Sequence, residues 1–249
     1  MDNVMARRRT ERWWAGLVVC AALLAGGCAA GTAGLPSGTQ ASSDEGRDQL
    51  LLTSSELPAG SSPVEVSEDR IADGFATAAG IADWSTTAGP LTVTPAECGS
   101  AQKDLANQLQ QLTGNASFAG AQTVDGIVFT EVISGSALDL ASISDILARC
   151  GQMTVSASVL GKQVSSTSVD ISTLSTPGDL NMLGAIAFHT VVRSDVVGQQ
   201  AMATSSYTGC AVIGGMTIVV RAENLAGGGE GAFEDVFNSA VEKVRAATQ

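Results

Sequence analysis

The chain has 249 residues, of which 45% are hydrophobic and only 4% aromatic, and its formal net charge is −12. Residues 1–27 hold four arginines and two acids, so the remainder keeps nine basic and 23 acidic residues and a charge of −14. Such a surface repels phosphate backbones, and nucleic acid is therefore excluded as a partner. With so few aromatic residues, the core has to be built from Val, Ile, Leu and Ala.

Residues 1–27 have the pattern of an export signal. Four arginines precede an apolar run from Trp13 to Leu24, and small residues follow up to Cys28. A positive head, an apolar run of about 7 to 15 residues and a small-residue exit describe a secretory signal peptide. The run is too short to cross a bilayer, which needs about 20 apolar residues. Residues 1–27 are therefore predicted to be a signal peptide.

Cys28 closes the sequence LAGGC, which resembles a bacterial lipobox. The resemblance implies cleavage between Gly27 and Cys28 and lipidation of Cys28, so that the membrane becomes a partner through this anchor. Cys20 would leave with the signal. The protein is then expected on the outer face of the cytoplasmic membrane. The alternative is an ordinary secretory signal whose small residues include a chance cysteine.

Residues 28–47 are rich in Gly, Ala, Ser and Thr and are predicted to form a flexible tether behind the lipidated cysteine. Residues 48–249 remain, about 200 residues, which is enough for one domain with a sound core. No second linker interrupts them. The segment 64–79 fits a strand and a helix equally well, and that choice stays open.

Two helices are predicted in the first half of this domain. Residues 94–109 begin with Thr94 as N-cap, Pro95 in the first helical position and Glu97 completing a capping box. Residues 136–150 begin with a weaker box between Ser136 and Asp139. On this second helix the buried side is predicted to consist of Ile143, Ile146 and Leu147.

A C-terminal helix is predicted over residues 231–246. Apolar residues recur on one face of it at helical spacing, and the acids gather at its start and the bases at its end. We expect this face to lie on the sheet. The alternative is an exposed docking face. The face consists of Phe233, Val236, Phe237, Ala240, Val241 and Val244.

Six segments rich in β-branched residues are predicted to be strands. Turn residues separate them at Gly161, Pro177–Gly178, Ser194–Asp195 and Gly214–Gly215. Short connections permit only antiparallel neighbours. The predicted fold class is α+β: an antiparallel meander of about five to six strands, with two helices before it and one C-terminal helix packed on it. The segments are residues 121–133, 151–160, 162–171, 182–192, 199–208 and 216–223.

Three cysteines lie in the predicted domain: Cys98, Cys150 and Cys210. In an oxidising compartment two of them should pair. Cys98 falls in the first turns of the first helix and Cys150 ends the second, so a Cys98–Cys150 disulfide is predicted if these helices lie side by side. Cys210 is then a buried free thiol. The three cysteines lack metal-ligand spacing, and neither a metal nor a cofactor is expected.

Several short motifs resemble a known group of proteins. LLLTSSELPAG, TPAECG, RCGQMTV and MTIVVRAE, with the closing helix, are similar to actinobacterial, mostly mycobacterial, lipoproteins that carry a sensor-like domain. They are also distantly similar to the extracellular domain of the membrane kinase PknH. The resemblance spans residues 49–247 and implies a disulfide at Cys98. That kinase domain has two disulfides, and this chain has cysteines for only one of them.

The sequence contains no recognisable set of catalytic residues. His189 is the only histidine, and its place inside a strand favours a structural role. Asp69, Asp73, Asp83, Asp125 and Glu131 lack paired spacing and are expected on the solvated surface. The leading hypothesis is a non-enzymatic binding or sensor-like domain for an unknown envelope ligand or protein. The second is a lipid or glycolipid carrier, and the third, a hydrolase, needs a serine and an acid beside His189.

Overall fold

The computed structural model describes residues 43–67, 71, 91–225 and 229–249, all of which belong to one compact unit. The signal peptide, Cys28 and most of the predicted tether lie outside the described residues, as do Asp69, Asp73 and Asp83. Helix α1 begins inside the predicted tether, and its buried Arg47 donates from Nη2 to Asn115 Oδ1 at 2.8 Å. The described helices are α1 (Ser43–Asp48), α3 (Glu97–Thr113), α4 (Leu140–Cys150), α5 (Gly178–Met182) and α6 (Glu230–Ala247).

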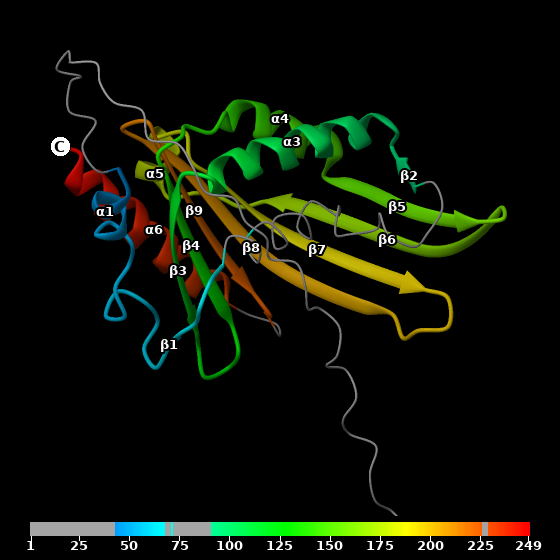
Figure 1. The fold of residues 1–249 in the computed structure, drawn as a ribbon, viewed down its shortest axis with the longest axis horizontal. Coiled ribbons are helices and arrows are strands. Elements are labelled where there is room, and N and C mark those ends of the chain that lie inside the picture. The colour runs from blue at the N-terminus through cyan, green and yellow to red at the C-terminus, as the bar shows by residue number, and fades with distance from the viewer. Residues whose placement is uncertain (1–42, 68–70, 72–90, 226–228) are drawn as a thin grey trace, which may run out of the picture. The chain divides into compact units, whose positions relative to one another are not determined.

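The described residues form one antiparallel sheet in the order β1-β3-β4-β9-β8-β7-β6-β5-β2 (Figure 1). The predicted α+β class is confirmed, although the sheet has nine strands where about five to six were expected. Strands β5 to β9 form the predicted meander. The strands are β1 (Ser62–Pro63), β2 (Leu91–Thr94), β3 (Ala116–Gln122), β4 (Val128–Ser134), β5 (Gln152–Val159), β6 (Lys162–Thr173), β7 (Ile186–Val196), β8 (Met202–Ile213) and β9 (Met216–Glu223).

The additional strands have identifiable causes. Residues 121–133 are split by a turn in which Ile127 N–H donates to Thr123 Oγ1 at 3.0 Å and Gly126 has a φ of +85°. This turn makes the β3–β4 hairpin, which lies between the two predicted helices rather than after them and joins the meander through β4 and β9. The Ser194–Asp195 turn was wrongly predicted, because both residues continue β7 and pair with β6.

Both predicted capping boxes are wrong. Thr94 belongs to β2, where it pairs with Thr154 of β5, and α3 begins only at Glu97. In α4 the N-cap is Asp139 and not Ser136, since Asp139 Oδ1 accepts a hydrogen bond from Ser142 N–H at 3.0 Å. The buried side of α4 is the predicted one.

The sheet is covered on both faces (Figure 1). Helix α6 packs with Phe129, Val220 and Ala211 on one face, while α3 and α4 pack with Met153 and Val169 on the other. All six predicted apolar residues of α6 are buried, so the core interpretation of this helix is confirmed and the docking interpretation is wrong. On the sheet, Gly209 leaves room for the ring of Phe237: a Cβ at this position would lie 2.7 Å from Phe237 Cδ1.

We predict that Phe237→Ala lowers the free energy of unfolding by about 3 to 5 kcal/mol, because it opens a cavity between α6 and the sheet. Gly209→Ala should cost about 1 to 3 kcal/mol in the wild-type background, because its methyl group meets the Phe237 ring. In the Phe237→Ala background that cost should largely disappear. Urea unfolding of the four proteins measures this coupling, and an equal cost of Gly209→Ala in both backgrounds would contradict the proposed contact.

Candidate functional site

A disulfide ties together the two helices that cover one face of the sheet. Cys98 of α3 and Cys150 of α4 are joined, with their Cα atoms 5.6 Å apart and both side chains buried. The bond closes a loop with a sequence separation of 52 residues, which corresponds to about 4 kcal/mol in the chain-entropy model. The β3–β4 hairpin lies within this loop. The bond therefore holds α3 and α4 as one unit over the sheet.

A small cavity of about 40 Å³ lies beneath this helix pair, between it and strands β6 to β9. Five of its ten lining residues are leucine or isoleucine, and three are polar. The lining residues are Gln102, Leu105, Leu109, Ile143, Leu147, Ile171, Phe188, Thr208, Cys210 and Arg221.

Each of the three polar side chains carries a buried atom with no hydrogen-bond partner: Gln102 Oε1, Thr208 Oγ1 and Arg221 Nη1. Gln102 Nε2 reaches only Met153 Sδ, at 3.4 Å. The Arg221 side chain is 8% exposed, and its Nε is ion-paired with Glu223 Oε1 at 2.6 Å. A buried polar group without a partner costs about 1 to 3 kcal/mol. Three such groups gather around this one cavity, which makes it the candidate binding site among the described residues.

Cys210 lines the same cavity as a free thiol, buried as predicted. Burial raises the pKa of the Cys210 thiol to about 12, because the apolar surroundings disfavour the thiolate. The thiolate is the nucleophilic form of cysteine, so Cys210 is unreactive near neutral pH. Cys210 therefore contributes to the cavity only as an apolar lining residue.

His189 lies on the opposite face of the sheet from the cavity. Its Nε2 is 2.6 Å from Ser205 Oγ, and its ring lies 4.6 Å from that of Tyr207, which stacks in turn on Phe233 of α6. The hydrolase hypothesis needs a serine and an acid beside His189, and the serine is present. However, no carboxylate contacts the ring within the described part of the chain. The contacts match the predicted structural role of a satisfied strand histidine.

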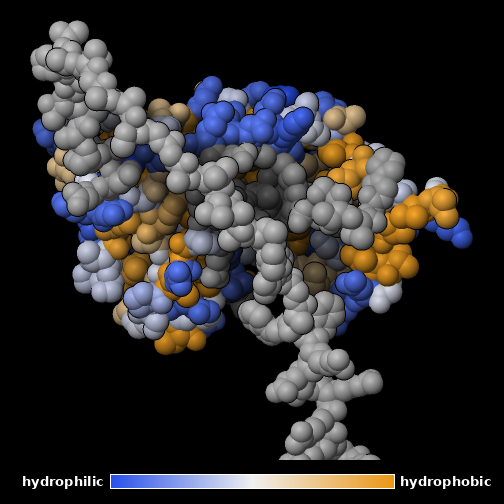
Figure 2. Space-filling model, viewed as in Figure 1, coloured by the Kyte–Doolittle hydropathy of each residue, from blue (hydrophilic) through white to orange (hydrophobic). Residues whose placement is uncertain are grey.

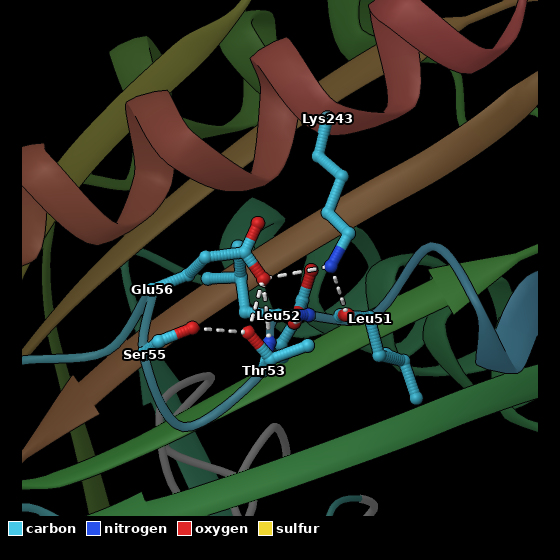
Figure 3. A network of polar contacts seen from close by, with 7 residues as sticks. Leu51, Leu52, Thr53, Ser55, Glu56 and Lys243 are labelled. Carbon is cyan, nitrogen blue, oxygen red and sulfur yellow. Dashed lines mark hydrogen bonds and ion pairs between the residues drawn. The ribbon is translucent and has the colours of Figure 1, made fainter.

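The expectation for Glu131 is wrong, because this carboxyl is 4% exposed and lies under the segment that follows α1. Glu131 Oε2 accepts from Leu52 N–H at 2.7 Å, whereas Oε1 has no partner. Beside it, Lys243 of α6 donates to Leu51 O at 2.8 Å and to Glu56 Oε2 at 2.7 Å (Figure 3). This network fastens residues 51–56 to α6. Asp125, by contrast, is exposed as expected.

The two carboxyls of this network are shifted in opposite directions. Desolvation raises the pKa of Glu131 to about 7, and the hydrogen bond with Lys243 lowers the pKa of Glu56 to about 2. Glu131 is therefore largely neutral in the folded protein below neutral pH. Through its hydrogen bond with Leu52, this buried acid helps to hold the N-terminal segment.

The described ranges contain neither a metal-binding cluster nor a membrane-spanning helix. No cluster of three or more His, Cys, Asp or Glu side chains there is arranged to hold a metal ion. Nor is any of the helices described above both long and apolar enough to cross a membrane.

Comparisons with known proteins give one similar structure. No protein-family model matches the chain, and no curated protein does. The extracellular domain of PknH from Mycobacterium tuberculosis resembles it with a TM-score of 0.40 and 12% identity, over 82% of this chain and all of that domain. Similarity at this level assigns neither a family nor a function to the chain.

We predict that Glu131→Gln removes a pH dependence of stability. The folded pKa of Glu131 is about 7 and its ordinary value is 4.5, so the folded state binds the proton more tightly and loses stability as pH rises through this window. At about pH 8 the glutamine variant should be more stable by about 2 to 3 kcal/mol. Its amide oxygen still accepts from Leu52.

Urea unfolding across this pH range measures the difference between the two proteins. Near the lower end of the window they should be nearly equal. A constant difference between Glu131→Gln and the wild type at every pH would show that Glu131 does not titrate in this range.

Proposed function

We propose that this chain is an exported lipoprotein, anchored through Cys28 on the outer face of the cytoplasmic membrane, whose domain binds a small envelope molecule and is not an enzyme. The anchor is supported by the sequence of residues 1–28. The binding role is supported by one observation above all: three buried polar atoms without partners surround an apolar cavity. No catalytic set accompanies the cavity among the described residues.

The charge at the cavity indicates which ligand group it suits. Arg221 is balanced by Glu223, so the pair is neutral overall and leaves the Nη1 amino group in need of an acceptor. Thr208 Oγ1 can donate or accept a hydrogen bond, and Gln102 Oε1 can accept one. A carboxylate or an ammonium group would bring an unbalanced charge into a desolvated place, which is costly. We therefore propose a ligand with an apolar body and a neutral hydrogen-bonding group.

A lipid or glycolipid carrier is the second candidate, and the apolar wall of the cavity favours it. Its size does not. About 40 Å³ holds a few water molecules and is well below the roughly 150 Å³ of a cavity that takes up benzene. Any ligand with an apolar body therefore needs the disulfide-linked pair α3 and α4 to move away from the sheet, and an acyl chain needs the larger displacement.

We predict that Thr208→Val abolishes ligand-induced stabilisation. In the ligand-free protein this nearly isosteric change should be neutral or stabilising by about 1 kcal/mol, because it removes a buried hydroxyl without a partner. Addition of an organic extract of the native membrane should raise the melting temperature of the wild type but not that of Thr208→Val.

Thr190→Val is the matched control. Thr190 is also buried on a neighbouring strand with an unpartnered Oγ1, but it does not line the cavity. Its variant should respond to the extract like the wild type. Equal responses of all three proteins, or no response in any, would contradict binding at this cavity.

We also predict that Cys28→Ser abolishes membrane attachment through lipid. The variant should be released into the medium or accumulate unprocessed with residues 1–27 attached, because no thioether can form at serine. Intact-mass measurement of membrane and soluble fractions decides this. A variant that keeps both its membrane retention and the mass of the wild type would refute the anchor, and Cys210→Ser serves as a control cysteine replacement.

A further inference from the structure

Two hairpin turns lie side by side at one end of the sheet (Figure 1). The β5–β6 turn consists of Leu160 and Gly161, and residues 197–201 connect β7 to β8. Strands β6 and β7 are neighbours, and Val197 N–H donates to the carbonyl oxygen of Val164 at 3.0 Å. The two turns are therefore held together as one structural edge.

This edge and the adjoining start of β2 expose five of the eight large apolar side chains that are exposed in the described ranges. Leu160 is 99% exposed, Val197 76% and Met202 64%. Figure 2 shows hydrophobic surface at this end of the sheet. Such clustering marks an interaction site, whereas single exposed apolar residues do not. We call this surface the hairpin-tip patch; it consists of Leu91, Val159, Leu160, Val197 and Met202.

The turn chemistry at Leu160 gives an independent indication. Leu160 and Gly161 have φ values of +51° and +75°, which is the backbone of a two-residue turn that favours Asn-Gly. A leucine is unfavourable in this left-handed conformation, and here its side chain is also fully in water. A leucine at this position therefore favours neither the folding nor the solubility of the protein. Positions that break local rules in this way are commonly functional.

We propose that the hairpin-tip patch inserts into the surface of a lipid bilayer. A standard protein interface engages about 20 to 30 residues on each side. The five side chains of the patch, on two turns and the adjoining strand ends, are too few for one. A bilayer needs no complementary shape. The only charged residues in these turns and their immediate flanks are Lys162 and Asp195, which balance, whereas the whole chain carries −12. The patch is thus a part of the surface that anionic lipid does not repel.

The proposal rests on the proposed function only in one respect: an anchored domain would meet its membrane at high effective concentration. The test is therefore made without the anchor. Residues 28–249 with Cys28→Ser are mixed with phosphatidylcholine vesicles and floated through a density gradient. We expect the protein to float with the vesicles. Higher salt should not weaken this binding, because the contact is apolar.

The double variant Leu160→Asn, Met202→Ser should lower the vesicle partition coefficient about tenfold or more. Asparagine suits the turn, so the fold should be kept, and circular dichroism verifies this. The control is Met182→Ser, which replaces an exposed methionine on α5 and should float like the parent. A parent protein that does not float, or equal flotation of parent and double variant, would overturn the proposal.

A concentration-dependent dimer that the tip substitutions abolish would overturn it as well, because a second copy would then cover the patch. None of these results bears on Cys28, which is absent from the tested protein, or on the cavity, which the substitutions leave intact. Failure of this proposal is therefore distinguishable from failure of the proposed function.

Discussion

The structure depends on the burial of β8 and β9 on both faces. Helix α6 covers them on one side, and the disulfide-linked pair α3 and α4 lies over the other. Between Thr217 and Ala222 every residue of β9 is buried. In such a strand a polar side chain needs a partner from the protein, from buried water or from a ligand. Thr208 and Arg221 are therefore informative, since each keeps an unpartnered atom beside the cavity.

The two faces differ in what they can do. On the α6 face, large apolar side chains fill the space around Phe237, and the polar network of Lys243, Glu56 and Glu131 holds the N-terminal segment onto that helix. On the other face two helices held to each other by a covalent bond leave a small cavity against the sheet. The first face stabilises the domain. The second has the small cavity and the unsatisfied polar groups on which the proposed binding role rests.

Much of the fold could be predicted from the sequence, and the site could not. Helix α6 was predictable because its apolar stripe is complete, and the meander because its strands are separated by short turns. The β3–β4 hairpin was missed although Asp125–Gly126 is a recognised hairpin signal. Thr94 and Pro95 match a helix start, but tertiary pairing of Thr94 with Thr154 in β5 prevails. Glu131 was expected on the surface and Arg221 was not singled out, since their burial depends on elements distant in sequence.

We propose that the cavity under α3 and α4 holds a bound small molecule in the native protein. Native mass spectrometry of the mature protein, purified from its own membranes in mild conditions, tests this most directly. The expected result is one small molecule retained on each chain, released on unfolding, with an apolar body and an uncharged hydrogen-bonding group. A protein mass without any such molecule, across several mild preparations, would contradict the claim.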